Sequence, residues 1–451
     1  MEKMKIGFVG FGEVNTPRDV VEKKCADALE IVKSLGYPVV TTAPVADDEA
    51  YAEANRAIAE LRQDRFELLV VCVAGWIPTH AVIKVIDKFR HTPMLLWGLC
   101  GWMEGDTIVS TADQAGTTGL RHAMQEMGYK FKYVWSTMGL PAPVEELRTW
   151  AKAVEASVLL RDARMGTMGW RDMLLYGTMA DGVHIRSQIG VEVEPFEMLE
   201  IYQKVQTLEK EKIDEGVKYV RENFRFTAPC DDKPIADTVA WALAISERVK
   251  RRGYDAVSLI DVDGMKKLMG IPPAMIFLLL DRWCGVCTIP ENDIMGAVTQ
   301  LMVRYATGQI AAYGEFYEFF ENSLLVGVPD FIPREVTEGE QVIKPSTFGL
   351  LSTSLLNVSK FKTGRVTMCR LIDKGGKYVM QLVTGDASQP PKWEECGWEP
   401  PAPRLPSLEI RPDCGVKEFA RNVSGQHTIL SYGDNTQVIR ELCDILGIEV
   451  L

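Results

Sequence analysis

The chain has 451 residues, of which 47% are hydrophobic and 25% are charged, as in soluble globular enzymes of about two to four domains. Its net charge is −12. Nucleic acids and anionic membranes recruit proteins through basic surfaces, so this acidic balance argues against both as the main partner.

Targeting signals and cysteine usage both favour a cytoplasmic protein. No apolar run approaches the ~20 residues that span a bilayer, and residues 1–6 lead directly into a strand, which is not the pattern of a signal peptide. The ten cysteines are scattered, as reduced thiols usually are. Cys284 and Cys287 have C-x-x-C spacing but lack the second pair that a structural zinc site requires.

The first third of the chain alternates predicted strands with predicted helices. The strands are expected at residues 5–9, 39–42, 66–74 and 93–97, and the helices at residues 17–35, 48–61 and 115–127. The run at 66–74 is apolar throughout, as in a parallel strand buried on both faces. This alternation predicts a doubly wound α/β domain over residues 1–160.

A glycine-rich turn follows the first strand, but it does not fit a dinucleotide site. Gly7, Gly10 and Gly12 have G-x-x-G-x-G spacing instead of G-x-G-x-x-G, and no acid follows at the position that would bind ribose. We expect these glycines to permit a tight turn between strand and helix.

Tryptophans follow two of the predicted strands, at the edge where doubly wound sheets bind ligands. Trp76 and Trp102 could therefore stack on the apolar face of a sugar. Tryptophans are usually mostly buried, however, and this favours core positions for Trp76, Trp97 and Trp102.

A second α/β domain is predicted over residues 161–343. A helix expected at residues 144–160 leads into it. Within it, strands are expected at residues 191–198 and 256–260, and helices at residues 200–223 and 235–252. Residues 164–171 are glycine-rich and basic, and fit either an anion or sugar site or a plain turn. Residues 274–280 fit a helix or a strand. Asp261 and Asp263 follow the strand at 256–260, so we predict that they contact substrate.

The stretch from Pro290 to Glu315 predicts a helix followed by a returning strand. Pro290 can open the helix, and Gly308 can end it. One face of this helix recurs at spacings of three and four: Met295, Val298, Met302 and Tyr305. A short apolar run at 310–313 then leads to Glu315. Glu291 and Glu315 could converge to hold a hard divalent cation, or could be a helix-dipole contact and a solvated acid.

The last part of the chain predicts a mainly β, barrel-like C-terminal domain over residues 344–451. Strands are expected at 364–372, 377–385 and 427–432, and a closing helix ends at Leu446. His427, one of five histidines, opens the last strand. It is a candidate metal ligand, although single histidines more often have structural roles.

These candidate residues also resemble motifs of the L-fucose isomerase and D-arabinose isomerase family, to which L-arabinose isomerase is more distantly related. The matching segments are Glu291-Asn292-Asp293, Ala306-Thr307-Gly308 with Glu315, and His427 with Ser431-Tyr432-Gly433. The two acids are 315 − 291 = 24 residues apart, which fits the family, although its second acid is usually Asp. Weaker matches at Met168-Gly169, 193–199 and 222–225 extend thinly over most of the chain.

The resemblance implies an aldose–ketose isomerase that works through a cis-enediol with a divalent metal, Mn²⁺ or alternatively Mg²⁺ or Co²⁺. It implies that Glu291, Glu315 and His427 bind this metal and that the two acids also transfer protons. It further implies a homo-oligomer, a hexamer or trimer, in which each N-terminal domain supplies sugar contacts to a neighbouring subunit. By position, Arg18 and Trp76 match these contacts.

The sequence departs from the family around the sugar. Asp261-Val262-Asp263 replaces a Gln-Gly-Gln stretch, Gly327 to Asp330 replaces a Ser/Ala-rich loop, and the chain is shorter than typical members after Glu315. We expect a rebuilt pocket for a pentose, deoxyhexose or related sugar. The alternatives are a non-catalytic sugar-binding or regulatory protein on the same scaffold, and another enolising enzyme, an epimerase or a lyase.

Overall fold

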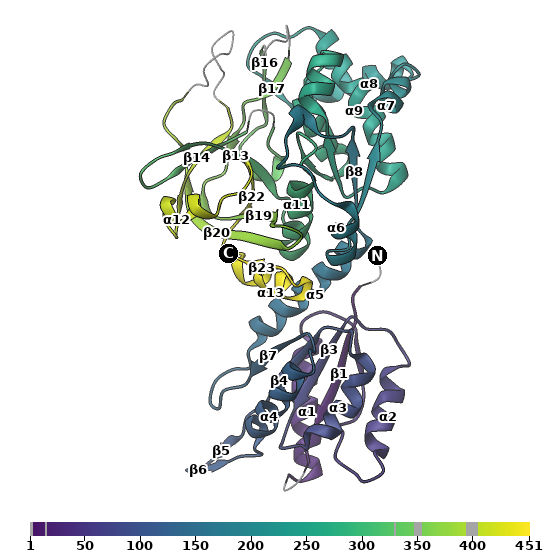
Figure 1. Ribbon diagram of the computed structural model, residues 1–451, viewed down its shortest axis with the longest axis vertical. Helices are drawn as coiled ribbons and strands as arrows, with labels where there is room; N and C mark the ends of the chain where they lie inside the picture. The colour runs from purple at the N-terminus through teal and green to yellow at the C-terminus, as the bar shows by residue number, and fades with distance from the viewer. Residues whose placement is uncertain (1–2, 14–15, 329–330, 347–353, 394–404) are drawn as a thin grey trace. The chain divides into compact units, whose positions relative to one another are not determined.

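The structure, a computed structural model, describes residues 3–13, 16–328, 331–346, 354–393 and 405–451. The chain divides into two compact units, Met1–Val158 and Leu159–Leu451 (Figure 1). Parallel α/β sheets and a closed C-terminal barrel confirm the predicted fold class. The predicted domain boundaries at residues 160 and 343 stay a prediction. In the described part of the chain, no helix has the length and apolar character needed to cross a membrane.

The first unit is built on a five-stranded parallel sheet with the order β2-β1-β3-β4-β7. Its strands are β1 (Ile6–Phe11), β2 (Val39–Thr41), β3 (Leu68–Val73), β4 (Met94–Gly98) and β7 (Phe131–Trp135). Its helices are α1 (Arg18–Lys33), α2 (Ala52–Leu61), α3 (Thr79–Ile86), the short η1 (Asp87–Phe89) and α4 (Asp113–Glu126). A hairpin of β5 (Trp102–Glu104) and β6 (Thr107–Val109) follows β4. The sequence pattern did not predict α3, the hairpin or β7.

Helices cover both faces of this sheet. Ile58 of α2, Val82 of α3 and Leu120 of α4 share one core with Val9 and Val71 of the strands. On the opposite face, α1 packs so closely that a Cβ on Gly10 would lie 2.3 Å from the Cys25 sulfur. Gly10 therefore permits close packing of α1 against β1, and this is a structural role.

The three tryptophans of this unit do not share one environment. Trp97 lies inside β4 and is 1% exposed, as expected. Trp76 is 40% exposed and Trp102 is 36% exposed, so their expected core positions are wrong. Trp76 lies beyond the end of β3 and Trp102 lies in the hairpin, so neither belongs to the five-stranded sheet.

The second unit contains a four-stranded parallel sheet with the order β12-β11-β8-β9. Its strands are β8 (Arg164–Met168), β9 (Glu192–Phe196), β11 (Ala256–Leu259) and β12 (Cys287–Ile289). The accompanying helices are α5 (Val144–Asp162), which crosses the border between the units, η2 (Asp172–Leu174), α6 (Gly182–Gln188), α7 (Met198–Val205), α8 (Lys210–Asn223), α9 (Asp232–Arg252), the π-helix η3 (Asp261–Met269), α10 (Ala274–Cys284) and α11 (Ile294–Thr307).

Two local interpretations in this region need correction. Residues 164–168, expected in a turn or an anion site, form β8. The Tyr254 ring packs directly on Gly166 of this strand, because a Cβ on Gly166 would lie 2.5 Å from a ring carbon. The single charged helix expected over residues 200–223 is two helices, α7 and α8, which break at residues 206–209. Residues 274–280, left open between helix and strand, are the buried part of α10.

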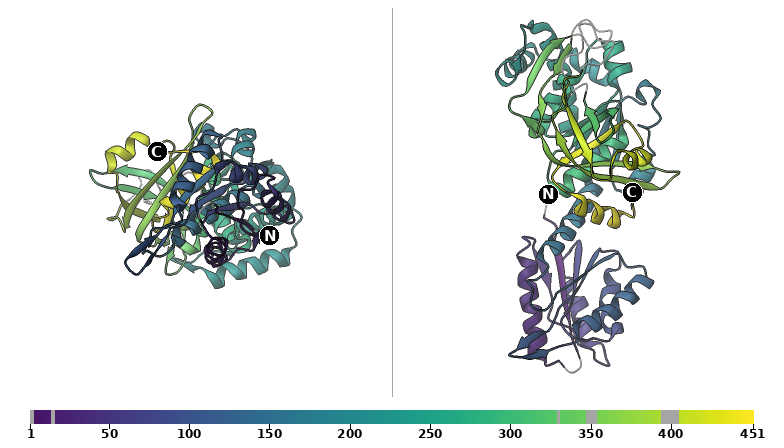
Figure 2. Two further views of the ribbon diagram at one scale, coloured as in Figure 1. Left: turned by 90° about the horizontal axis from the view of Figure 1, so that it is seen from below. Right: turned by 90° about the vertical axis from the view of Figure 1, so that its left-hand side faces the viewer.

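The C-terminal strands close into a barrel with the order β19-β22-β13-β14-β21-β20, because β20 pairs again with β19. Figure 2 shows these strands in green to yellow. They are β13 (Ala312–Phe319), β14 (Leu324–Gly327), β19 (Gly364–Asp373), β20 (Tyr378–Ser388), β21 (Ser407–Pro412) and β22 (His427–Tyr432). Helices α12 (Val416–Asn422) and α13 (Thr436–Leu446) and the strand β23 (Glu449–Val450) complete this part. β13 and β14 precede residue 343, so strands from both sides of that predicted boundary share one sheet.

Two small sheets and a short helix lie beside the barrel. One sheet joins β10 (Arg225–Phe226), β16 (Val342–Ser346) and β17 (Ser354–Asn357), and the other joins β15 (Thr337–Glu338) and β18 (Lys360–Phe361), after η4 (Arg334–Val336).

Helix α11 lies between the parallel sheet and the barrel (Figure 1). It contacts β11 and β12 on one side and β19 and β22 on the other. This position explains its sequence, because a helix that is apolar all round is buried all round. Two hydrogen bonds tie it to both layers: Leu371 N donates to Thr299 Oγ1 at 3.0 Å, and Gln300 Nε2 donates to Thr288 O at 3.0 Å. Its N-terminus is therefore fixed where the two sheets meet.

Candidate metal centre

Glu315 and His427 lie side by side on two paired strands of the barrel. They are direct partners in the antiparallel register of β13 and β22, so their side chains leave the sheet on the same face, with Cβ atoms about 5 Å apart. Glu315 Oε1 lies 3.6 Å from His427 Nε2. Glu315 was expected just after the strand, but it lies inside β13, which is longer than its apolar run because a barrel strand alternates buried and exposed faces.

Glu291 approaches from a loop that precedes α11. The helix begins at Ile294 and not at Pro290, because Asp293 caps it by accepting a hydrogen bond from Gly296 N at 2.9 Å. Glu291 and Asn292 both adopt left-handed backbone angles, with φ of 63° and 49°. Consecutive non-glycine residues rarely do so, and each costs about 1–3 kcal/mol unless its surroundings hold it there.

Hydrogen bonds from three directions hold this loop. Glu291 N donates to Asp261 Oδ1 at 2.7 Å, and Asn292 N donates to Leu259 O at 3.0 Å. The Asn292 side chain donates to Met168 O at 2.8 Å and also to Trp170 O. The carboxyl ends of β8 and β11 therefore fix the backbone from which the Glu291 carboxylate projects.

The loop, β13 and β22 bring one oxygen of Glu291, one oxygen of Glu315 and a nitrogen of His427 within 4.8 Å of one another. Glu291 Oε2 lies 3.6 Å from His427 Nε2, and it also accepts a hydrogen bond from Gln426. His427 Nε2 is buried and has no hydrogen-bond partner among the described residues. Two carboxylates and a buried, unpartnered imidazole nitrogen are a donor set that fits a divalent cation such as Mn²⁺.

The other ring nitrogen of His427 is held by an acid. His427 Nδ1 lies 2.7 Å from Asp293 Oδ2, and Arg370 donates to both oxygens of Asp293 at 2.5 and 2.9 Å. This is the usual arrangement behind a metal-binding histidine, because the carboxylate fixes the tautomer and leaves Nε2 as the donor atom.

The ionisation of this pair follows from the same contacts. Burial lowers the pKa of His427, but the neighbouring carboxylates of Asp293 and Glu315 outweigh burial and raise the pKa to about 10 in the metal-free chain. Burial raises the pKa of Asp293, but Arg370 and His427 outweigh burial and hold this pKa well below its usual range. A bound cation would have to displace the proton from His427 Nε2.

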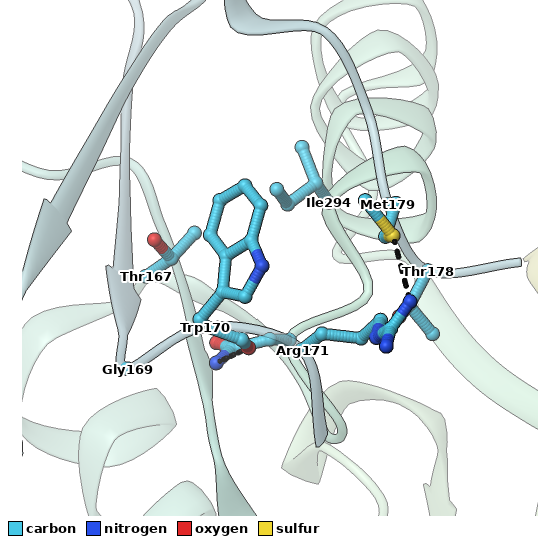
Figure 3. A pocket seen from close by; sticks show the side chains of 8 residues that line it. Thr167, Gly169, Trp170, Arg171, Thr178, Met179 and Ile294 are labelled. Carbon is cyan, nitrogen blue, oxygen red and sulfur yellow. Dashed lines mark hydrogen bonds between the residues drawn. The ribbon is translucent and has the colours of Figure 1, made fainter. Parts of the chain in front are cut away.

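A small cavity of about 10 Å³ lies beside the Glu291 loop (Figure 3). This volume accommodates about one water molecule. Its wall includes Asn292, and the other lining residues are Thr167, Gly169, Trp170, Arg171, Thr178, Met179 and Ile294. Arg171 Nη1 lies 3.5 Å from the Met179 sulfur, as the dashed line in Figure 3 marks.

The comparison with known families identifies the barrel. Residues 337–451, about a quarter of the chain, match the family described as L-fucose isomerase, C-terminal domain. Over these residues the chain is similar to the C-terminal domain of L-fucose isomerase. A search of curated proteins found no match to the chain. The matched residues include His427 and Arg370.

Asp261 and Asp263, predicted to contact substrate, have different surroundings. Asp261 is 1% exposed, faces Lys266 at 3.2 Å and accepts the Glu291 amide. Asp263 is more exposed, pairs with Lys267 at 2.8 Å and accepts the Met173 amide at 2.8 Å. Contact of either acid with substrate stays a prediction.

The candidates of the N-terminal unit have contacts of their own. Arg18 pairs with Glu22 at 2.8 Å and with Glu53 at 3.0 Å. Trp76 is partly exposed beyond β3. Both belong to Met1–Val158, and their role in a neighbouring subunit's site stays a prediction. Asp330 lies outside the described residues.

The C-x-x-C pair does not join a metal cluster in the described part of the chain. Cys284 ends α10, and Cys287 is buried in β12, where Arg304 donates to its sulfur at 3.8 Å. The group of His, Cys, Asp and Glu side chains that could hold an ion there is Glu291, Glu315 and His427.

The sequence pattern missed the residues that support these three. Asp293 could have been noticed, because it belongs to the Glu-Asn-Asp match and stands before a helical segment, where Asp often caps. Arg370 and Gln426 carry no local signal, because their contacts span 77 and 135 residues.

Proposed function

We propose that the chain is a metal-dependent aldose–ketose isomerase that acts on a pentose, deoxyhexose or related sugar through a cis-enediol. The observation that carries this proposal is the convergence of Glu291, Glu315 and His427, with donor atoms within 4.8 Å of one another. They come from three separate segments, and the histidine nitrogen among them is buried and has no hydrogen-bond partner among the residues that the structure describes.

In this proposal, Glu291, Glu315 and His427 hold a divalent cation, Mn²⁺ or alternatively Mg²⁺ or Co²⁺. Such an ion would draw electron density from the carbonyl and hydroxyl oxygens of the sugar and stabilise the negative charge of the enediolate. The donors suit this role because carboxylate and imidazole are common ligands of these ions.

In this reaction, the acidic side chains transfer protons. An aldose becomes a ketose when C2 and its hydroxyl each lose a proton while C1 and its oxygen each gain one, so the sugar keeps its composition. We assign these transfers to the carboxylates of Glu291 and Glu315: one takes the carbon-bound proton and returns it to the neighbouring carbon, and the other moves the hydroxyl proton.

The surrounding residues keep these groups in place. Asp293 orients His427 through Nδ1, and Arg370 in turn fixes both oxygens of Asp293. Gln426 donates to Glu291 Oε2 and so orients this carboxylate. These residues act through others and are positioning residues.

Solvent deuterium exchange tests the proposal. The wild type, stripped of metal and then supplied with Mn²⁺, should incorporate deuterium into at least one sugar of a panel of pentoses, deoxyhexoses and hexoses. Glu291→Gln should reduce exchange by at least about 100-fold, the lower range for losing a general acid–base group. Glu318, an exposed acid on the strand that carries Glu315, supplies the control, and Glu318→Gln should exchange like the wild type.

The position of the label separates the alternatives. A labelled ketose supports isomerisation, whereas an epimer or a cleaved product would replace it with another enolising reaction. Mn²⁺ binding and sugar binding without any exchange would favour the non-catalytic sugar-binding protein.

The resemblance of the sequence motifs to the L-fucose isomerase family supports a cytoplasmic homo-oligomer, a hexamer or trimer with shared sites. Sedimentation of the purified chain would test its oligomeric state.

A further inference from the structure

We propose that the buried ion pair of Asp261 and Lys266 is a positioning device that sets the backbone of Glu291 for metal binding. The inference rests on the proposed role of Glu291 as a metal ligand. Neither residue was predicted to act in this way, and Lys266 was not a candidate at all.

The pair is carried by an unusual helix. Residues Asp261–Met269 form a π-helix, in which hydrogen bonds join residues five apart, and such segments are often found at functional sites. This spacing brings Lys266 back over Asp261, and Met265 N donates to Ile260 O at 3.0 Å in the same pattern.

The start of the π-helix is pinned by a second buried acid, Asp172. Its carboxylate accepts from Val262 N at 2.9 Å, from Asp263 N at 2.8 Å and from Met173 N at 3.1 Å. Asp172 is 0% exposed. The π-helix therefore begins from a fixed point directly after Asp261, so the position of the Asp261 side chain is fixed as well.

The two carboxylate oxygens of Asp261 contact different partners. Oδ1 accepts the Glu291 amide at 2.7 Å, and Oδ2 lies 3.2 Å from Lys266 Nζ. Hydrogen bonds to an ionised acceptor are stronger than neutral ones. Asp261 thus holds the amide of a residue whose φ of 63° is unfavourable, and Lys266 balances the charge and orients the carboxylate.

Burial makes a purely structural role for this pair a poor explanation. The side chains of Lys266 and Asp261 are 6% and 1% exposed. A buried ion pair loses hydration, and apolar residues of similar volume often support a fold as well or better. The advantage of the pair is directional, because only an acceptor at this place can hold the Glu291 amide.

The next turn supplies a matched control. Asp263 and Lys267 form a pair on the same π-helix, with side chains 35% and 61% exposed, and Asp263 holds the Met173 amide instead of a ligand residue. Removal of Lys267 therefore takes an identical charge from the same helix without touching the Glu291 loop.

The test measures Mn²⁺ affinity by calorimetry on full-length, metal-stripped protein without sugar. Lys266→Met should bind Mn²⁺ about 10- to 100-fold more weakly than the wild type, the range for losing support behind a metal ligand. Lys266→Arg should recover most of this affinity. Lys267→Met should stay within about twofold of the wild type, as expected for an exposed pair.

The double variant Asp261→Leu/Lys266→Met removes the acceptor for the Glu291 amide together with both charges of the pair, so it serves if Lys266→Met does not fold. Weaker Mn²⁺ binding by whichever variant folds supports the proposal. Wild-type affinity in a folded Lys266→Met or double variant overturns it.

Failure of this inference can be told from failure of the proposed function. Mn²⁺ binding by the wild type without any sugar exchange would defeat the isomerase and leave the affinity comparison decisive. Sugar exchange together with equal Mn²⁺ affinity in all variants would retain the isomerase and overturn the positioning role. A wild type that binds no Mn²⁺ would overturn both.

Discussion

Asp293 combines three contacts in one buried side chain. It holds His427 Nδ1, accepts both Arg370 donors and caps α11 through Gly296 N. Its side chain and that of Arg370 are 1% and 5% exposed. The carboxylate therefore links the orientation of the histidine to the start of the helix and to the barrel strand β19.

We predict that Asp293→Asn destabilises the fold by about 3–5 kcal/mol, because it leaves the Arg370 charge buried without its partner. The cap itself should survive, since Asn caps helices as well as Asp does. Mn²⁺ affinity should fall by about 10- to 100-fold. Urea unfolding and calorimetry measure the two effects.

Asp386→Asn is the control, because Asp386 is 75% exposed in its pair with Arg365. Its free energy of unfolding should stay within about 0.5 kcal/mol of the wild type. A folded Asp293→Asn with wild-type stability and Mn²⁺ affinity would contradict the role of Asp293.

At the scale of elements, α11 is packed without spare room at its first turn. A Cβ on Gly296 would lie 2.4 Å from Ile289 Cδ1, 2.6 Å from Asp293 Oδ2 and 2.9 Å from Arg370 Nη1. Glycine at this position lets the helix approach β12 and leaves space for the ion pair that orients His427.

We predict that Gly296→Ala destabilises the protein by about 1–3 kcal/mol through overpacking. This sign is opposite to that of an ordinary helix position, where alanine is favoured over glycine by about 1 kcal/mol. Gly119 of α4 is the matched control, because a Cβ there meets nothing within 4 Å. Gly119→Ala should raise the midpoint of thermal unfolding of Met1–Val158, whereas Gly296→Ala should lower the midpoint of Leu159–Leu451; a shift of the same sign in both variants would be incompatible with the packing described.

The same helix shows how far sequence reasoning reaches. Its apolar period and its end at Gly308, which has a φ of 74°, follow from local rules. Its start does not, because Pro290 and Asp293 are both acceptable near a helix N-terminus and only the tertiary contacts of the Glu291 loop decide between them. The closed barrel was predicted as a class, but its pairings were not, since β13 pairs with β22 across the sequence.

At the scale of the whole molecule, the candidate ligands all belong to Leu159–Leu451, and Met1–Val158 has a core of its own. A ligand that binds only the folded state stabilises by about 2.7 kcal/mol at a concentration of 100 times its Kd. Bound Mn²⁺ should therefore stabilise the unit that holds the site against unfolding.

We therefore predict two calorimetric transitions, of which only one moves upward when Mn²⁺ is added. His427→Ala should remove this shift and leave the other transition unchanged. A single transition that shifts as a whole would show that the two units unfold together, and no shift in the wild type would argue against the metal centre.

The pairing of Glu315 with His427 has a consequence for synthesis of the chain. The two partners are 427 − 315 = 112 residues apart in sequence. At a translation rate of about 5–20 residues per second, roughly 6–22 s pass between their appearance. During this interval the nascent chain carries both acids without the imidazole, so it can complete the cluster only after the last barrel strand has been made. Metal binding by the nascent chain would then mark the point at which the barrel of this unit has formed.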